Sequence, residues 1–359
     1  MTASPTATPV STIDVTGRGT PTIVMKHGAG GRAMRRLIEE VLVPGFSDAP
    51  VDGIGLAAMD DGAALRVGDS WLVVTTDSHV VNPIVFPGGD IGRLAVCGTV
   101  NDLAMMGATN PLGLTCALIV EEGVPYSLVE SVHASMLAAC REAGTTIVTG
   151  DTKVMGRGEI DGIVINTTGI GFTDRVIPDA GLRPGDRIIV TGTIGDHGMA
   201  IMALRHDLGL EASLASDVAP LNHMIRDALA SAPGGVSAMK DPTRGGVSSA
   251  LHEMAQKSGV GIVLHEALIP LSPVVRAAAD MLGLDPLHVA NEGKALLGVR
   301  GGDAVVDRVL DALRRHDAGR DAAVIGECVA ERPGDVILDT GIGRRLVSES
   351  DGELLPRIC

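Results

Sequence analysis

The strongest constraint on the fold is a repeated alternation of strand-like and helix-like segments. Residues 71–76 form an apolar run typical of a buried strand, and residues 90–107 carry apolar side chains at helical spacing. A second strand is predicted at 114–120 and a second helix at 128–143, which Gly144 is expected to end. Two more strands are predicted, at 146–148 and 162–171. This order of elements predicts an α/β or α+β domain.

A turn-rich stretch at 178–186 interrupts the pattern and predicts a domain boundary, because its Gly and Pro residues favour turns. A second series of elements begins with a strand at 187–191. It continues with helices at 197–208, 217–230, 246–257, 272–282 and 303–314, and with strands at 261–264, 295–299 and 324–329. The length of 359 residues suits two domains of ordinary size.

The two ends of the chain differ in composition from its interior. The first residues are rich in Thr, Ser and Pro, and the chain becomes polar again near its end. Segments of this kind seldom bury enough apolar surface to fold. We therefore predict a disordered arm at 1–23, an N-terminal domain at 24–177, a C-terminal α+β domain at 178–333 and a mobile tail at 334–359.

Composition argues against two classes of partner. Aromatic residues make up 1% of the chain and the net charge is −15, whereas proteins that bind nucleic acid need positive charge and often stacking surfaces. We therefore expect no nucleic-acid partner. No apolar run approaches the roughly 18 residues of a membrane span, and the N-terminus lacks the pattern of a signal peptide. We expect no membrane partner and a cytoplasmic location.

The cysteines indicate reduced thiols. They are odd in number and scattered, without any CxxC spacing: Cys97, Cys116, Cys140, Cys328 and Cys359. This distribution argues against a disulfide framework and against a zinc or iron–sulfur site. All but Cys359 lie in apolar stretches and are expected to be small core residues.

Acidic residues recur where predicted strands end and in glycine-rich turns. Asp77 and Asp151 directly follow predicted strands, and Asp102 interrupts an apolar helix. The others are Asp60, Asp61, Asp241 and Glu292. Ligands in α/β proteins gather at the carboxyl ends of strands, and acids that converge there need a cation. A single Asp is equally explained as a helix cap or turn residue, but the set indicates Mg²⁺ bound with a nucleotide.

The few basic residues near these acids are candidates to bind phosphate. The chain has only five lysines: Lys26, Lys153, Lys240, Lys257 and Lys294. Lys153 follows Asp151 and is the best candidate to contact a phosphate or a reacting group. Arg244 is expected to bind phosphate or to form a surface salt bridge. The glycine-rich turn at 27–32 either presents N–H groups to an anion or is an ordinary flexible turn.

The sequence ends in Pro356-Arg357-Ile358-Cys359. A thiol behind a proline, which cannot continue a helix, is expected to be exposed and free to move into a pocket and out again. Chance is the alternative explanation when this feature is taken alone.

Together these motifs resemble the HypE family of hydrogenase maturation factors. The motifs are His27-Gly28-Ala29-Gly30-Gly31, Thr76-Asp77-Ser78, Phe86-Pro87-Gly88-Gly89, Cys97-Gly98-Thr99-Val100-Asn101-Asp102, Val148-Thr149-Gly150-Asp151-Thr152-Lys153-Val154, Gly195-Asp196-His197-Gly198, Asp241-Pro242-Thr243-Arg244-Gly245-Gly246, Ala290-Asn291-Glu292-Gly293-Lys294 and Pro356-Arg357-Ile358-Cys359. They cover residues 24–359 in family order.

The resemblance implies a two-domain fold like that of aminoimidazole ribonucleotide synthetase. The N-terminal domain would bind ATP and form a dimeric β-barrel with a second subunit, and a flexible tail would follow the C-terminal α+β domain. The implied magnesium ligands are Asp61 (or Asp60), Asp102 and Asp241. The implied ATP-binding positions are Asp77, Asn101, Asp102, Gly150, Asp151, Thr152, Lys153 and Arg244. The implied catalytic positions are Cys359, Lys153 and Glu292, with Cys359 carrying the reacting group.

The implied activity is the ATP-dependent dehydration of an S-carbamoyl group on Cys359 to a thiocyanate. This reaction would supply cyanide ligands for the iron of a [NiFe] hydrogenase. The implied partners are the carbamoyltransferase HypF, an iron-carrying HypC–HypD complex and a second copy of the chain.

Two other readings stay open at this point. One is a synthetase of the same superfamily that acts on a free purine intermediate or on selenide, and its activity would not depend on Cys359. The other is a non-catalytic scaffold that holds iron, and it would show no ATP turnover dependent on Asp102.

Overall fold

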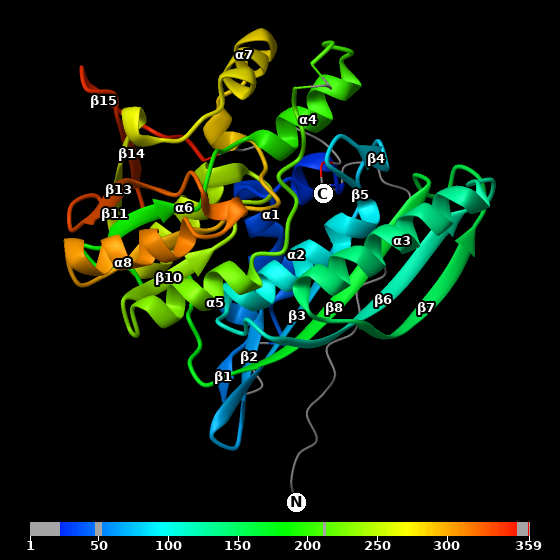
Figure 1. Ribbon diagram of the computed structural model, residues 1–359, viewed down its shortest axis with the longest axis horizontal. Helices are drawn as coiled ribbons and strands as arrows, with labels where there is room; N and C mark the ends of the chain where they lie inside the picture. The colour runs from blue at the N-terminus through cyan, green and yellow to red at the C-terminus, as the bar shows by residue number, and fades with distance from the viewer. Residues whose placement is uncertain (1–21, 47–51, 211–212, 350–357, 359) are drawn as a thin grey trace, which may run out of the picture.

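The computed structural model describes residues 22–46, 52–210, 213–349 and 358. It contains two large β-sheets with helices packed on them, as Figure 1 shows. This architecture confirms the mixed α/β class and the two-part organisation predicted from the sequence. The predicted boundary at 177/178 falls in the connection between the last strand of the first sheet and the first strand of the second.

The first sheet has six strands in the order β1-β2-β3-β8-β6-β7. Neighbouring strands are antiparallel except β6 and β7, which are parallel. The strands are β1 (Gly53–Ile54), β2 (Ala63–Val67), β3 (Ser70–His79), β6 (Pro111–Glu121), β7 (Ile147–Met155) and β8 (Ile163–Thr173). A separate hairpin joins β4 (Val85–Phe86) to β5 (Gly89–Asp90). The strand β7 therefore forms one edge of the sheet.

Two helices lie over one face of this sheet (Figure 1). Helix α2 (Ile91–Met105) packs on β3 and β8 and buries nearly all of its side chains, and Asp90 caps its first turn. Helix α3 (Tyr126–Ala143) packs against α2 and ends at Gly144, whose φ of 72° suits glycine. Both helices confirm the predictions. On the opposite face, side chains such as Val74 and Ile170 stay partly exposed.

The second sheet has seven strands in the order β10-β12-β9-β13-β11-β14-β15. Only β11 and β14 pair in parallel. The strands are β9 (Arg187–Val190), β10 (Val236–Lys240), β11 (Gly261–His265), β12 (Leu296–Val299), β13 (Ala323–Val329), β14 (Val336–Asp339) and β15 (Arg344–Leu346). The sequence did not predict β10, which leads directly into Asp241.

Helices cover both faces of the second sheet. They are α4 (Asp196–Arg205), α5 (Asn222–Ser231), α6 (Gly246–Ser258), α7 (Pro273–Leu282) and α8 (Asp303–Leu313). Helix α6 shares one buried apolar cluster with the sheet, and α5 and α8 share another. The second of these clusters also includes Ala104 and Met105 of α2. Helix α2, which packs on the first sheet, therefore also contributes to the core around the second sheet.

The prediction of a mobile tail from residue 334 is wrong for its first part. Val336 and Leu338 are buried, and β14 pairs in parallel with β11. Val347, beyond β15, is buried as well. Both strands are short, and β14 pairs with a strand far away in the sequence, so no local pattern marks them. Residues 350–357 and Cys359 lie outside the described residues, as does the predicted arm up to residue 21.

Three other boundaries differ from the predictions. The helix predicted at 217–230 begins only at Asn222, because Pro220 disfavours helical backbone in the residue before it. Strand β3 continues to His79, and β7 continues to Met155. Asp77 and Asp151 therefore lie inside strands and not at strand ends. The first sheet is mostly antiparallel, so the carboxyl ends of its strands do not gather at one edge as expected.

Two further predictions concern membrane-spanning helices and the state of the cysteines. Among the described helices, none is long and apolar enough to cross a lipid bilayer. The four cysteines that the structure describes carry free thiols, as predicted: Cys97, Cys116, Cys140 and Cys328.

Candidate active site

A pocket of about 510 Å³ opens between the two sheets. Its walls come from the short helix α1 (Arg32–Leu37), β3, α2 and the turn after β10. These segments are far apart in the sequence. The structure brings five of the predicted site residues to this pocket: Asp61, Asp77, Asp102, Asp241 and Arg244.

The packing of α2 on β3 sets the distance between the acids on these elements. Thr75 Oγ1 lies 2.8 Å from Asp102 Oδ2 and donates a hydrogen bond to it. Asp77 Oδ2 lies 3.2 Å from His79 Nε2. A Cβ atom added to Gly98 would come within 2.8 Å of the same nitrogen. Glycine at this position of α2 therefore allows the helix to approach the strand at the site.

Asp77 keeps its negative charge. Burial alone would raise the pKa of Asp77, but His79, Arg244 and the Ser78 N–H outweigh burial and lower this pKa to about 2. The Arg244 guanidinium lies 3.9 Å from Asp77 Oδ1. Arg244 belongs to the second domain and Asp77 to the first, so this contact links the two domains across the pocket.

The other three acids, Asp61, Asp102 and Asp241, have raised pKa values and are therefore less readily ionised than exposed carboxyls. Burial raises the pKa of Asp102 well above its ordinary value, and the nearby Asp241, Asp77 and Asp61 raise it further. The pKa of Asp241 rises to about 8, again mainly through burial and then through Asp61. Burial also raises the pKa of Asp61, although Lys240 opposes the shift. A bound cation would restore the charge of these carboxylates.

The donors of this cluster fit a magnesium ion. Asp61 Oδ2 is buried and has no hydrogen-bond partner among the described residues. In the part of the chain that the structure describes, no three His, Cys, Asp or Glu side chains are placed so that they could hold a metal ion by themselves. Mg²⁺ usually needs only one or two carboxylates, together with substrate phosphates and water. Asp61, Asp102 and Asp241 therefore suit Mg²⁺ that is bound with a phosphate compound.

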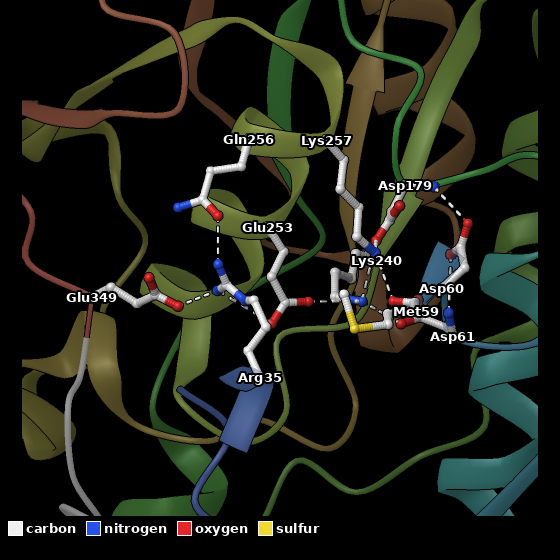
Figure 2. A network of polar contacts seen from close by, with 10 residues as sticks. All are labelled: Arg35, Met59, Asp60, Asp61, Asp179, Lys240, Glu253, Gln256, Lys257 and Glu349. Carbon is white, nitrogen blue, oxygen red and sulfur yellow. Dashed lines mark hydrogen bonds and ion pairs between the residues drawn. The ribbon is translucent and has the colours of Figure 1, made fainter. Parts of the chain in front are cut away.

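A buried lysine neutralises part of the acidic cluster (Figure 2). Lys240 Nζ lies 2.5 Å from Asp61 Oδ1, 3.5 Å from Asp179 Oδ2 and 3.3 Å from Glu253 Oε2. Three acids thus share one ammonium group. Burial disfavours the charge of Lys240, but these acids, with Asp61 first, raise its pKa well above the ordinary value. Lys240 is therefore a permanent cation beside the predicted metal ligand.

A second lysine extends this network toward the domain boundary (Figure 2). Lys257 Nζ lies 2.6 Å from Asp179 Oδ2 and 2.6 Å from the Met59 carbonyl oxygen. Asp60 accepts hydrogen bonds from the backbone N–H groups of Asp61 and Asp179. Asp60 is therefore engaged with backbone groups, whereas Asp61 presents a free oxygen. Of the two neighbours, Asp61 is therefore the better candidate to bind a metal ion.

Arg35 fixes α1 over the pocket (Figure 2). Its guanidinium donates to Gln256 on α6 and forms an ion pair with Glu349 near the end of the described chain. Gly30 and Gly31, which precede α1, line the pocket. The glycine-rich turn of the sequence therefore lies at the candidate site.

Glu292 is buried behind the acidic cluster. Its Oε1 atom has no hydrogen-bond partner among the described residues. Burial raises the pKa of Glu292 well above its ordinary value, with further repulsion from Asp241 and Asp217. The Asp217 carboxylate accepts the Glu292 N–H at 3.0 Å and pairs with Lys294 at 3.0 Å. The backbone of Glu292 is therefore fixed, while its carboxyl oxygen Oε1 can still accept or donate a hydrogen bond.

Asn101 joins the two domains. Its side-chain nitrogen donates to the carbonyl oxygens of Ala219 and Glu292, both at 3.1 Å, and its oxygen accepts the Leu221 N–H at 2.8 Å. These bonds use the whole amide group, which is almost fully buried. Asn101 thus holds the Glu292 segment in place, and it does not line the pocket with Asp102.

The predicted residues at 150–153 lie elsewhere in this chain. They belong to β7, which is separated from β3 by β8 and β6. With strands about 4.8 Å apart, three steps correspond to about 14 Å. Lys153 Nζ lies 3.1 Å from Asp151 Oδ2, and both side chains are exposed. Within one chain, these residues do not meet the acidic pocket. Cys359, the predicted carrier, lies outside the described residues.

From the sequence, no role was predicted for Asp179, Glu253 and Arg35, and Lys240 and Lys257 were named only among the five lysines. The scarcity of lysine was the signal that drew attention to these two, although it favoured Lys153. Asp179 lies in the turn-rich boundary, where an acid is explained by the turn alone.

Comparison with known families covers both halves of the chain. Residues 59–173 match the model of the AIR synthase related protein N-terminal domain, and residues 183–339 match that of its C-terminal domain. The thiamine monophosphate kinase from Aquifex aeolicus has the same fold, with a TM-score of 0.60 at 20% identity.

Closer relatives cover nearly the whole chain. The carbamoyl dehydratase HypE of Rhodobacter capsulatus is 46% identical over 340 residues, which include 94% of this chain and 98% of that protein. The HypE of a HypE–HypF complex is similar with a TM-score of 0.79 and 42% identity, covering 88% of this chain and 99% of that one. A HypE in complex with ATP has a TM-score of 0.77 and 42% identity, covering 94% and 100%. The chain belongs to the HypE family of carbamoyl dehydratases.

Proposed function

We propose that this protein uses ATP to dehydrate an S-carbamoyl group on Cys359 to a thiocyanate, as the source of cyanide ligands for the iron of a [NiFe] hydrogenase. The observation that carries the proposal is the pocket itself. It is lined by the carboxylates Asp61, Asp77, Asp102 and Asp241. The buried Glu292 carboxyl, whose pKa is raised by burial and then by Asp241, and one oxygen of which has no partner among the described residues, lies outside this lining. Family membership and the ATP complex of a relative support the same assignment.

ATP would bind with its phosphates beside the acidic cluster. Asp61, Asp102 and Asp241 would hold Mg²⁺ there, and the ion would neutralise charge on the transferring phosphate. Arg244 would pair with phosphate oxygens, since guanidinium groups bind phosphate in a bidentate manner. Lys240 stays paired with Asp61 and limits the negative charge that the nucleotide meets.

The chemistry follows from the poor leaving ability of an amide oxygen. The carbamoyl oxygen attacks the γ-phosphorus of ATP, and ADP leaves. The oxygen is now part of a phosphate ester and can depart with its bonding electrons. Loss of both N–H protons and cleavage of the C–O bond then give S–C≡N and inorganic phosphate. The overall change is the removal of one water from the carbamoyl group at the expense of one ATP.

Glu292 is suited to accept an N–H proton in this sequence. Its raised pKa makes its carboxylate a stronger base than an exposed glutamate. Asn101 and Asp217 fix its backbone and so its direction. Burial also keeps water away, and the phosphorylated intermediate would otherwise hydrolyse.

A homodimer would complete this site. The first sheet exposes its β7 edge, and its face opposite α2 carries partly exposed apolar side chains. We propose that a second copy packs there in a barrel-like arrangement. Asp151 and Lys153 of one copy would then reach the pocket of the other, together with Gly150 and Thr152. Lys153 would assist the reaction by charge or proton transfer.

Two protein partners follow from the reaction. A carbamoyltransferase must load Cys359. The structure of a relative in a HypE–HypF complex supports HypF as this carbamoyltransferase. An iron-carrying acceptor, the HypC–HypD complex of the family, would take the cyanide. We place these steps in the cytoplasm, where free thiols such as the four described ones persist.

The experiment that tests the function is the intact mass of the C-terminal peptide. Cys359 is loaded with a carbamoyl group, and the full chain then receives ATP and Mg²⁺. We expect the loss of one water, which the Glu292→Gln variant fails to catalyse and the Cys359→Ala variant cannot show. A loaded peptide that keeps its mass while ATP is consumed would contradict the proposal.

A further inference from the structure

Two motifs of the sequence have no role in the reaction so far: Phe86-Pro87-Gly88-Gly89 and Gly195-Asp196-His197-Gly198. In the structure they meet. The rings of Phe86 and His197 lie edge to face, 5.4 Å apart at an interplanar angle of 89°. His197 is fully buried at the start of α4. A buried polar ring of this kind needs hydrogen-bond partners.

One partner of His197 comes from the end of the chain. His197 Nε2 lies 2.8 Å from the backbone carbonyl oxygen of Ile358. Ile358 is itself 3% exposed and shares a buried apolar cluster with Phe86, Val218 and Ala290. Ile358 is therefore held by a hydrogen bond to its carbonyl oxygen and by the apolar packing of its side chain.

The other partner determines the tautomer of His197. Its Nδ1 lies 2.7 Å from Ser216 Oγ, and Ser216 Oγ accepts the Val218 N–H at 3.1 Å. A carbonyl oxygen can only accept, so Nε2 must carry the proton that binds Ile358. Nδ1 then accepts the Ser216 hydroxyl proton. Burial lowers the pKa of His197, which favours this neutral form.

The same segment is tied to Glu292. Ser216 precedes Asp217, whose carboxylate accepts the Glu292 N–H. Ala290, in the cluster around Ile358, lies two residues before Glu292. The β4–β5 hairpin fixes this segment from the other side, since the Ser216 N–H donates to the Pro87 carbonyl at 2.7 Å. A Cβ at Gly88 would come within 2.7 Å of the Ser216 carbonyl oxygen.

We propose that His197 is a positioning residue that binds the backbone of Ile358 and thereby holds the carrier cysteine close to Glu292. The binding site, which we call the Ile358 seat, consists of Phe86, His197, Ser216, Val218 and Ala290. Consecutive Cα atoms are about 3.8 Å apart, so a seated Ile358 restricts the space open to Cys359. The inference rests on the proposed function and gives both unassigned motifs a role.

The test measures seating and chemistry separately in the full-length chain. Seating is read as the rate at which iodoacetamide alkylates Cys359, resolved by peptide mass. Chemistry is read as the rate of ATP-dependent water loss from carbamoylated Cys359 at saturating ATP. The matched variants are His197→Leu, which removes the donor, and His197→Gln, whose amide N–H restores a donor at similar reach.

We expect His197→Leu to speed alkylation of Cys359 and to slow water loss, each by about two- to tenfold, the range of one hydrogen bond. His197→Gln should recover most of both rates, and the ATP concentration for half-maximal rate should not change. Ile358→Ser should reproduce both effects from the tail side. This second variant decides the matter if His197→Leu does not fold.

Unchanged rates of water loss in His197→Leu and Ile358→Ser would overturn the proposal, even if alkylation became faster. Glu292→Gln separates this proposal from the proposed function. It should abolish water loss and leave the alkylation rate as in the wild type. If the wild type itself lost no water, the proposed function would fail. Equal rates of Cys359 alkylation in His197→Leu and His197→Gln would then overturn the Ile358 seat as well.

Discussion

At the scale of single residues, the pocket is built around charges that the chain leaves incompletely neutralised. Three acids there have raised pKa values, whereas Asp77 has a lowered one. The difference comes from partners, since Asp77 faces His79 and Arg244. An acidic cluster without its cation destabilises the fold that contains it, which is a common cost of a binding site.

This cost predicts a pH dependence of stability. The pKa of Asp241 is about 8 in the folded chain and near 3.8 in the unfolded one. Between these pH values the folded state binds a proton that the unfolded state lacks, so stability falls as pH rises. We expect Asp241→Asn, which has no such proton to lose, to reduce the fall in melting temperature between pH 5 and pH 8.

The measurement is thermal unfolding of chelator-treated protein at both pH values. The exposed Asp307 on α8 supplies a matched control, and Asp307→Asn should behave like the wild type. Added Mg²⁺ with ATP should raise the melting temperature of the wild type more than that of Asp241→Asn. If the melting temperatures of wild type and Asp241→Asn depended on pH to the same extent, the Asp241 carboxyl would not have a raised pKa in the folded chain.

At the scale of elements, the first sheet carries the prediction of a dimer. Val74 on β3 pairs with Ile170 on β8, on the face that α2 does not cover. A buried unpaired charge at such a face is costly. We expect Ile170→Arg to convert a dimer into monomers with an intact fold. Light scattering after size exclusion would measure the mass. Met281→Arg on the exposed side of α7 is the control and should stay dimeric.

The elements also show where local sequence patterns fail. The long helices α2 and α3 and the stop at Gly144 follow directly from spacing and from glycine chemistry. The strands β10, β14 and β15 do not, because each is five residues long or shorter, and β10 and β14 pair with strands from distant segments. A short strand has no periodicity long enough to recognise.

At the scale of the whole molecule, the separation of Lys153 from the acidic pocket predicts a site shared between two copies. Asp102→Asn and Lys153→Ala should each be inactive alone. Mixed in equal amounts and allowed to exchange subunits, half of the dimers would pair the two variants and contain one intact site. The mixture should then reach about a quarter of wild-type activity.

The control is a mixture of Asp102→Asn with Asp241→Asn, two changes in the same pocket, which should stay inactive. The readout is water loss from carbamoylated Cys359. Failure of the first mixture to recover, with subunit exchange shown by mass, would contradict a site shared between two copies.

The sequence by itself determined the class of fold, the two-part organisation and the residue types at the site. These properties depend on hydrophobic spacing, on turn residues and on a set of motifs. All of these signals are formed by residues close together in the sequence. Asp61, Asp102 and Asp241, which the family resemblance implies as metal ligands, line one pocket. Only the tertiary structure decided which groups surround them. The ion pair of Lys240 with Asp61, the bonds of Asn101 and the contact of His197 with Ile358 join segments more than 100 residues apart. Such contacts depend on how the domains pack, because burial and distance set the energy of each polar group.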